Sequence, residues 1–458
     1  MSCRGLAGSR RSTSSPGKRG GGSPRDPCGA CGPATPSAQW GGDSPPGDGQ
    51  KEVSTMAKIA ICGYGTVGSG VAEVIAENAD SIARNAAEDV SVKYILDKRE
   101  FPGDPCEKLV VHDFSIIEND PEVSVVVETM GGCGAAYEFT KRALLAGKNV
   151  VTSNKELVAT RGHELIAIAK EKNLNYLFEA SVGGGIPIIR PITQCLTANR
   201  IDEVYGILNG TTNYILTEMI AHSATFEDAL HQAQENGFAE ADPTADIEGV
   251  DAARKICILA DLCFGKHVNP AEVHAQGITG VTLSDVEYAK RLSCKIKLLG
   301  RAIRTGHDTA TAYVAPHLVS NSSLLSNVDG VMNGIVVHGN ALGDAMFYGA
   351  GAGKRPTASA VVADVIDAVK HLKARKYLDW DDAPASYFTD STYLATRWYV
   401  RASTSLQQIG WAFDKVNFVT YPGAPADEYA FVTAVYDENT MLKLTGGMTV
   451  HSLFRILD

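Results

Sequence analysis

The chain has 458 residues, enough for two or three domains with substantial buried cores. Its 53 acidic and 42 basic residues give a net charge of −11, which argues against nucleic acid or an anionic membrane as a partner. No apolar run approaches the roughly 20 residues that a bilayer-spanning helix needs. These features predict a soluble protein. The cysteines from Cys62 onward are scattered singly, several of them within apolar runs, which is typical of a reduced cytoplasmic chain.

Residues 1–55 are rich in Gly, Ser, Pro and Arg and hold few large apolar side chains, so we expect them to be disordered. They form either a plastid-type transit peptide or an upstream extension, and in the second case the working protein begins at Met56. Cys28-Gly-Ala-Cys31 has no second cysteine pair, so we expect no zinc site there.

A glycine turn follows the first predicted strand. The short apolar run at 59–62 leads into Gly63-Tyr-Gly-Thr-Val-Gly68, and Val71, Val74 and Ile75 then recur at helical spacing. In a strand, turn and helix of this kind, glycines allow a pyrophosphate to approach the N–H groups of the helix. The candidate cofactor-binding residues are therefore Gly63, Tyr64, Gly65, Thr66, Val67 and Gly68.

The second predicted strand, 90–96, ends at Asp97-Lys98-Arg99. An acidic residue there binds the ribose 2′-hydroxyl of NAD, whereas a Lys-Arg pair accepts the 2′-phosphate of NADP. Both features are present, so the sequence leaves the choice between NAD and NADP open.

Further strands at 123–128 and 149–152 alternate with helices at 136–146 and 162–172, which predicts a doubly wound parallel sheet of the Rossmann type. Lys155 lies just past the end of a strand, where such sheets bind ligands. It is either a ligand-binding residue or an ordinary surface lysine.

Three glycines, Gly183 to Gly185, follow the next predicted strand. Their irregular backbone is either a plain crossover between domains or a seat for a hard cation that takes oxygen ligands. The residues by themselves favour the crossover.

The second half predicts an α+β domain with a mostly antiparallel sheet, whose strands lie at 203–208, 295–304, 309–318 and 334–338. A second glycine turn, which contains the candidate cofactor contact Gly353, feeds a helix at 357–372. The last 80 or so residues predict a small ferredoxin-like module. The expected domains are 56–185, completed by the helix at 356–373, then 186–355 and 374–458.

The stretch from 233 to 255 is acidic and then becomes apolar. A turn at Asp242-Pro243 predicts the start of a helix that runs to about Phe264. Within it, Asp251 and Lys255 share a stripe that becomes purely apolar one turn later. They form either an ordinary helical ion pair or a buried pair suited to acid/base chemistry.

The same stretch resembles the diagnostic motif of homoserine dehydrogenase, with every fixed position filled: Ala233, Gly237, Phe238, Ala239, Asp242, Pro243, Asp246, Ile247, Gly249, Asp251 and Lys255. The segments 153–156, 179–186 and 208–216 are similar to further blocks of that family. The likeness extends from residue 56 to about 373 and lacks a kinase half, as in the monofunctional enzymes.

The resemblance implies NAD(P)-dependent interconversion of L-homoserine and L-aspartate 4-semialdehyde by a homodimer or homotetramer. It makes Lys255 the proton carrier, places Lys155 between cofactor and substrate, and gives Asp251 and Glu240 to the amino acid and Gly237 to the cofactor. It also implies a monovalent cation, usually sodium, bound by Glu179, Val182, Gly184 and Ile186, which reverses the preference for a plain crossover.

The tail resembles an ACT domain in strand order, but Ala402-Ser-Thr-Ser-Leu-Gln replaces the turn that such a module often carries. It is therefore either a regulatory domain or an appendage that supports a dimer. Two rival functions remain, a catalytically silent NAD(P)-binding amino-acid sensor and a semialdehyde dehydrogenase that uses Cys133 as a thiol nucleophile.

Overall fold

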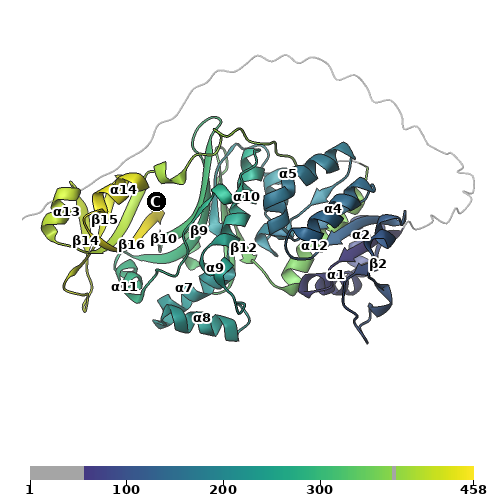
Figure 1. Cartoon of the computed structure of the whole chain (residues 1–458), viewed down its shortest axis with the longest axis horizontal. Coiled ribbons are helices and arrows are strands. Elements are labelled where there is room, and N and C mark those ends of the chain that lie inside the picture. Colours follow the sequence, from purple (N-terminus) through teal and green to yellow (C-terminus); the bar gives the residue numbers. More distant parts are fainter. Residues whose placement is uncertain (1–55, 374–377, 458) are drawn as a thin grey trace, which may run out of the picture. The chain divides into compact units, whose positions relative to one another are not determined.

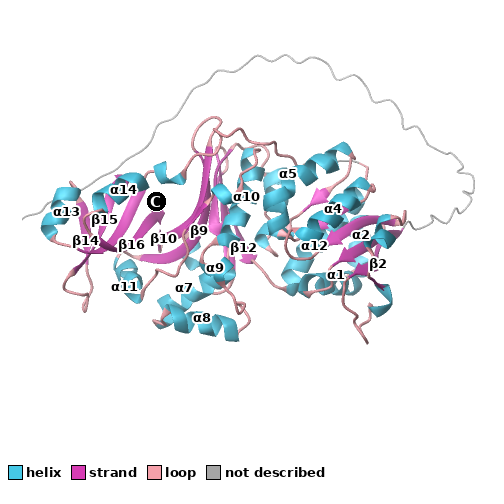
Figure 2. Ribbon diagram, in the orientation of Figure 1, coloured by secondary structure: helices cyan, strands magenta, loops and turns pink. Residues whose placement is uncertain are grey.

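The computed structural model describes residues 56–373 and 378–457, so the disorder expected for 1–55 and the Cys28–Cys31 pair lie outside the described residues. The described residues belong to one compact unit and form two sheets with helices packed around them (Figures 1 and 2). Among them, no helix is both long and apolar enough to cross a bilayer.

The first sheet has six parallel strands in the order β3-β2-β1-β4-β5-β6. Its strands are β1 (Met56–Cys62), β2 (Asp89–Leu96), β3 (Val110–Val111), β4 (Val123–Glu128), β5 (Asn149–Thr152) and β6 (Tyr176–Leu177). The apolar run of β1 is fully buried because that strand is central. The sheet confirms the predicted doubly wound architecture.

Helices cover both faces of this sheet. They are α1 (Thr66–Glu77), α2 (Ala79–Ala86), α3 (Phe114–Glu118), α4 (Gly134–Leu145), α5 (Lys155–Glu171) and α12 (Lys354–Lys370). The chain moves in opposite directions from β1 to β2 and from β4 to β5, so right-handed crossovers place α1 and α4 on opposite faces. The helix α12 returns from the second half of the chain and packs on α1 and α2.

The second sheet is mixed and has the order β12-β11-β7-β9-β10-β16-β13-β15-β14, with β8 beside β10. Its bounds are β7 (Ile201–Ile207), β8 (His274–Ala275), β9 (Cys294–Arg304), β10 (Ala310–Ser320), β11 (Met332–Gly339), β12 (Gly343–Ala350), β13 (Thr396–Ser403), β14 (Val416–Val419), β15 (Glu428–Tyr436) and β16 (Thr449–Leu457).

The remaining helices are α6 (Ala180–Gly183), α7 (Gly210–His222), α8 (Phe226–Glu235), α9 (Thr244–Ile247), α10 (Val250–Phe264), α11 (Leu283–Arg291), α13 (Leu406–Ala412) and α14 (Glu438–Thr445). Shorter turns are η1 (Glu107–Leu109), η2 (Pro191–Cys195), η3 (Pro270–Glu272), η4 (Leu324–Asn327) and η5 (Ser391–Tyr393). The helix α10 packs on β9 and on α5, so it joins the two sheets (Figure 1).

One predicted helix is wrong in its extent. We expected a continuous helix from the turn at Pro243 to Phe264, but the structure has the short α9 and then α10. Gly249 separates them with φ +82°, a left-handed conformation that ends a helix and is easy only for glycine. The helix expected at 162–172 begins earlier, at Lys155, because the side chain of Asn154 accepts the Leu157 N–H.

The tail runs β13-α13-β14-β15-α14-β16, and its four strands lie side by side in the order β16-β13-β15-β14. Its first attachment to the rest of the chain is the parallel pairing of β16 with β10. A second is the ion pair of the Arg401 guanidinium with Asp285 of α11 at 2.7 Å, while Glu428 of the tail itself pairs with the same guanidinium at 2.8 Å. The tail therefore extends the second sheet.

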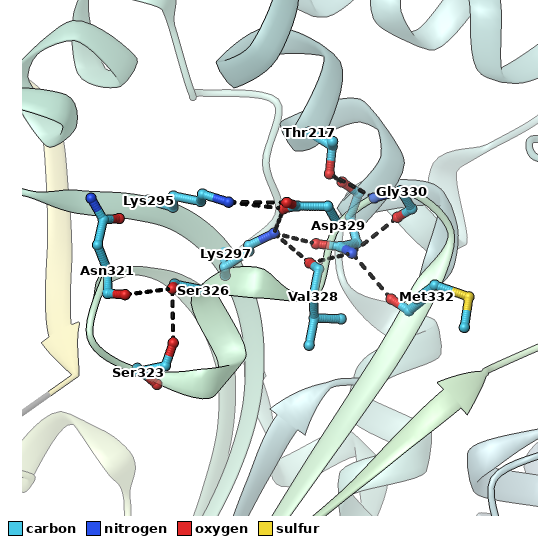
Figure 3. A network of polar contacts seen from close by, with 11 residues as sticks. Thr217, Lys295, Lys297, Asn321, Ser323, Ser326, Val328, Asp329, Gly330 and Met332 are labelled. Carbon is cyan, nitrogen blue, oxygen red and sulfur yellow. Dashed lines mark hydrogen bonds and ion pairs between the residues drawn. The ribbon is translucent and has the colours of Figure 1, made fainter.

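A buried lysine anchors the segment between β10 and β11. The Lys297 Nζ atom donates to the Val328 carbonyl at 2.6 Å and to Asn213 Oδ1 at 3.0 Å, and it pairs with Asp329 at 3.0 Å (Figure 3). Burial lowers the pKa of Lys297, and three oxygen partners compensate for the desolvation of its ammonium group. This network gives Lys297 a structural role outside the site described next.

Candidate active site

The site begins on α10, where Asp251 and Lys255 lie one turn apart. The Lys255 Nζ atom is 2.8 Å from Asp251 Oδ2 and donates to the Leu208 carbonyl at 2.7 Å. The side chains of Lys255 and Asp251 are only 8% and 5% exposed. The pair is therefore buried, which excludes the alternative of an ordinary surface ion pair.

A second lysine reaches the same carboxylate from the first sheet. Lys155 is the first residue of α5, and its Nζ atom lies 2.6 Å from Asp251 Oδ1. Asn154 fixes this helix start, since its side chain caps the helix and donates to the Gly132 carbonyl at 2.7 Å. Two lysines, one from each sheet region, thus converge on Asp251.

The two lysines have shifted pKa values of opposite sign. Burial disfavours charge on both, and at Lys255 it prevails over Asp251 and lowers the pKa of the ammonium group. At Lys155 the nearby Asp251 prevails over burial and raises the pKa. Burial alone would raise the pKa of Asp251, but the two ammonium groups hold it well below its usual range. Lys255 is thus the lysine poised to lose a proton.

The glycine turn lies between β1 and α1. Its first and last glycines, Gly63 and Gly68, are closely packed, whereas Gly65 is open. Gly63 has φ +95°, and a Cβ atom on Gly68 would lie 2.0 Å from the Gly63 carbonyl oxygen. At Gly65 a Cβ atom would meet nothing within 4 Å. Within the described residues, no side chain caps the start of α1. These open N–H groups suit the pyrophosphate of a dinucleotide.

Asp97 supports this turn from the end of β2. Its Oδ2 atom accepts the Tyr64 N–H at 2.8 Å, and its carboxylate pairs with Arg99 at 2.9 Å. Arg99 also donates to the Tyr64 carbonyl at 3.2 Å. Asp97 and Arg99, the acidic and basic candidates for binding the ribose end of the cofactor, therefore form an ion pair with each other.

Gly353, the second candidate cofactor contact, lies at the start of α12 with φ +116°. The next residue, Lys354, packs against Gly70 of α1, where an added Cβ atom would lie 3.0 Å from it. The beginnings of α12 and α1 are thus neighbours.

The loop before α9 carries Gly237 and Glu240, and both residues are exposed. The backbone carbonyl of Glu240 accepts from Gln234 at 3.1 Å. No hydrogen bond or ion pair described for residues 56–373 joins the Glu240 carboxylate to Lys255 or Asp251. Its predicted role toward the amino acid stays a prediction.

Two residues for which no role was predicted, Asp246 and Asn209, also lie in the site. Asp246 and Asn209 are linked by a hydrogen bond of 2.7 Å, and Asn209 also donates to Asp251 at 2.9 Å. The sequence carried a signal for both residues, because Asp246 is a fixed position of the motif and Asn209 is the second residue of the block 208–216 that is similar to the family. Neither could be placed beside Lys255 before the fold was known.

The expected cation ligands surround α6. The Glu179 carboxylate accepts the N–H groups of Ile188 at 2.6 Å, Ile189 at 2.7 Å and Arg190 at 2.9 Å. It is therefore already occupied in capping the following segment. The other candidates, Val182, Gly184 and Ile186, can offer backbone oxygens, and Gly184 has φ +57°. No cluster of three His, Cys, Asp or Glu suited to a metal occurs in the described part of the chain.

Comparison with known proteins places these features in a family. Residues 63–179 match the model of the homoserine dehydrogenase NAD-binding domain, and residues 187–366 match the homoserine dehydrogenase model. The homoserine dehydrogenase of Pseudomonas aeruginosa is 46% identical over 316 residues, which are 69% of this chain and 73% of that protein. The enzyme of Synechocystis is 44% identical over 317 residues, 68% of this chain and 73% of that protein.

Solved structures agree. A homoserine dehydrogenase from Thiobacillus denitrificans has a TM-score of 0.79 and 35% identity, covering 88% of this chain and 98% of that one. A hyperthermophilic archaeal homoserine dehydrogenase in complex with NADPH has a TM-score of 0.61 and 29% identity, covering 70% and 100%. With two matched domain models, these close relatives and a buried lysine beside a glycine-turn sheet, the chain belongs to the homoserine dehydrogenase family.

Proposed function

We propose that the chain interconverts L-homoserine and L-aspartate 4-semialdehyde with NAD(P), and that Lys255 moves the proton of the substrate oxygen. The observation that carries this proposal is the buried Lys255, whose Nζ atom is held at 2.8 Å from Asp251 and 2.7 Å from the Leu208 carbonyl. A nicotinamide supplies the hydride chemistry. The open turn from Gly63 to Gly68 would hold the pyrophosphate of the same dinucleotide, and Gly353 at the start of α12 would also contact the cofactor.

The proton transfer requires a neutral amine when homoserine is oxidised. Burial favours the neutral form of Lys255, while Asp251 opposes it. When the substrate ammonium binds Asp251, the carboxylate is shared with a new cation, and Lys255 can then accept the hydroxyl proton. Lys155 pairs with the other oxygen of Asp251 at 2.6 Å and would hold the carboxylate in place for the substrate. Positioning of the reacting carbon should provide a large part of the rate.

The decisive experiment is the formation of NAD(P)H from L-homoserine by wild type and by Lys255→Ala. We expect the variant to lose nearly all of its kcat. Lys297→Ala is a poor control because Lys297 anchors a loop, so the matched control is Lys172→Ala, at an exposed lysine just past the far end of α5. A Lys255→Ala enzyme with near-normal kcat would show that another group carries the proton.

The choice of cofactor is proposed to depend on the pair formed by Asp97 and Arg99. Arg99 has 62% of its side chain exposed and can turn toward a 2′-phosphate, whereas Asp97 is free for a ribose only when Arg99 moves. Arg99→Ala should therefore raise the KM for NADP more than the KM for NAD. Equal effects on both cofactors would contradict this role.

The cation proposal changes in one respect, because the Glu179 carboxylate is taken by three N–H groups. We place a sodium ion on backbone oxygens near Val182, Gly184 and Ile186, with Glu179 shaping that backbone. Replacing Na⁺ by tetramethylammonium should then lower the thermal unfolding midpoint of the enzyme. An unchanged midpoint and unchanged activity would remove the cation from the proposal.

The remaining expectations concern assembly and regulation. A homodimer or homotetramer is testable by sedimentation at assay concentration. The strand order of the tail supports an ACT-like module, and threonine titration of the activity tests whether it regulates.

The silent-sensor alternative predicts no turnover at all. The Sγ atom of Cys133 lies 3.3 Å from Thr160 Oγ1. The thiol alternative predicts that Cys133→Ala is inactive.

A further inference from the structure

Asn209 connects both acidic side chains of the site to the second sheet. It lies between β7 and α7 and is only 5% exposed. Its Nδ2 atom donates to Asp251 Oδ2 at 2.9 Å and to Asp246 Oδ1 at 2.7 Å. Both hydrogens of one amide group are therefore used by two carboxylates.

The other end of the amide fixes this orientation. The Asn209 Oδ1 atom accepts the Thr212 N–H at 2.9 Å and the Thr212 hydroxyl at 3.0 Å, so it caps the 13-residue helix α7. A reversed amide would point its oxygen at two carboxylates and its NH₂ group at a backbone N–H. The helix cap thus decides that the donors face the acids.

The backbone around Asn209 is equally constrained. The preceding Leu208 carbonyl accepts from Lys255 at 2.7 Å. A Cβ atom on the following Gly210 would lie 2.8 Å from the Val331 carbonyl oxygen, so this backbone lies against the start of β11. Two consecutive residues therefore orient Lys255, Asp251 and Asp246 together.

The charges of the site explain why an uncharged donor is useful here. Asp251 and Asp246 face Lys255 from α10 and Lys155 from α5, and the nearby pair of Arg254 and Glu156 adds one charge of each sign. Asn209 satisfies one oxygen of each acid without adding a third cation. When Lys255 is neutral, the two acids and Lys155 keep an excess negative charge, which attracts the ammonium group of an amino acid.

We propose that Asn209 is a positioning residue of the reaction, which holds Asp251 toward Lys255 and Asp246 beside it so that two carboxylates receive the ammonium group of the substrate. The inference rests on the proposed roles of Lys255 and Asp251. It extends the site by one residue that touches neither the substrate oxygen nor the cofactor turn.

The test compares Asn209→Asp and Asn209→Ser with wild type. Both replacements retain an oxygen that can cap α7, but neither retains the two amide donors. We expect kcat/KM for homoserine to fall about 10- to 100-fold, because hydrogen bonds to charged groups are among the stronger ones. The loss should be carried mainly by the KM for homoserine, with the KM for the cofactor unchanged.

The pH profile separates the two variants. Asn209→Asp places a third carboxylate beside the site, which raises the pKa of Lys255, so the acid limb of kcat/KM should move to higher pH. Asn209→Ser adds no charge and should move it less. The matched control is Asn269→Asp and Asn269→Ser, since the exposed Asn269 caps η3 far along the chain and its side chain accepts only the Ala271 N–H.

We expect wild-type unfolding midpoints for the two Asn269 variants and lower midpoints for the two Asn209 variants, because the buried carboxylates lose their donors and Asn209→Asp adds a third carboxylate. Activity is therefore measured below the onset of unfolding of each variant. The inference is overturned if both Asn209 variants keep kcat/KM, the KM for homoserine and the pH profile within about twofold of wild type. If Asn209→Asp is too unstable to assay, Asn209→Ser still tests the inference, because serine caps a helix about as well as aspartate and adds no charge. Failure of the proposed function looks different, because wild type itself would then not oxidise homoserine or Lys255→Ala would remain active.

Discussion

Replacing Asp251 by Asn should expose the energetic cost of the buried charges. The substitution keeps the shape of the side chain but removes the negative charge that Lys255 faces at 2.8 Å and Lys155 at 2.6 Å. Removing one partner of a buried pair costs about 3 to 5 kcal/mol, because the other charge is left uncompensated. Lys155 adds little, since 41% of its side chain is exposed and solvent screens it. We therefore expect a loss of about 3 kcal/mol at pH 7, assigned to Lys255.

The loss should depend on pH with a definite sign. Without Asp251, burial lowers the pKa of Lys255 further below its unfolded value of about 10.4. The destabilisation is then fully present below the folded pKa and is relieved as the pH rises toward the unfolded one. The difference in stability between wild type and Asp251→Asn should consequently shrink between pH 7 and pH 9.5.

The assay is thermal unfolding of the cofactor-free proteins at these two pH values. The double variant Asp251→Asn/Lys255→Met removes the stranded charge and should unfold closer to wild type than the single variant does, while remaining inactive. If the single variant is as stable as wild type at pH 7, or if the double variant is no better than the single one, the account of the buried pair is refuted.

Three further predictions concern other parts of the fold. Gly68→Ala should lower the thermal unfolding midpoint, because its Cβ atom would lie 2.0 Å from a carbonyl oxygen, and an unchanged midpoint would contradict the packing argument. Gly65→Ala, whose Cβ atom would meet nothing within 4 Å, should keep the midpoint but weaken cofactor binding measured by fluorescence titration. Burial raises the pKa of Glu128 to about 7, above its unfolded value, so the stability contributed by Glu128 should be lost as the pH rises from about 4.3 to 7. In urea unfolding, the free energy of Glu128→Gln relative to wild type should therefore rise over this range, and a constant difference would contradict the prediction. Arg401→Met should leave Asp285 buried without its cation and cost about 3 kcal/mol, with faster proteolysis of the tail; an unchanged digestion pattern would show that strand pairing alone attaches it.

Local patterns in the sequence were sufficient for several features. The apolar run before Gly63 and the helical spacing after it predict β1 and α1, because each depends on neighbours within one or two turns. The shared stripe of Asp251 and Lys255 follows from helix periodicity alone. The break at Gly249 was missed because the charges and apolar residues on either side continue the same helical spacing, and only the positive φ of the glycine shows the change of direction.

The tertiary structure decided which of these residues meet. Lys155 follows β5 of the first sheet, and Leu208 and Asn209 follow β7 of the second. Lys155 and Asn209 reach Asp251, and Leu208 reaches Lys255, only because α10 packs on α5 and on β7. Burial, which distinguishes the pair of Asp251 and Lys255 from an exposed ion pair and lowers the pKa of Lys255, is a property of that packing and of no local segment. By itself, the sequence determined the elements, the family and the chemical groups; long-range contacts determined their neighbours, since only the folded chain brings residues from different sheets together and excludes water from between them.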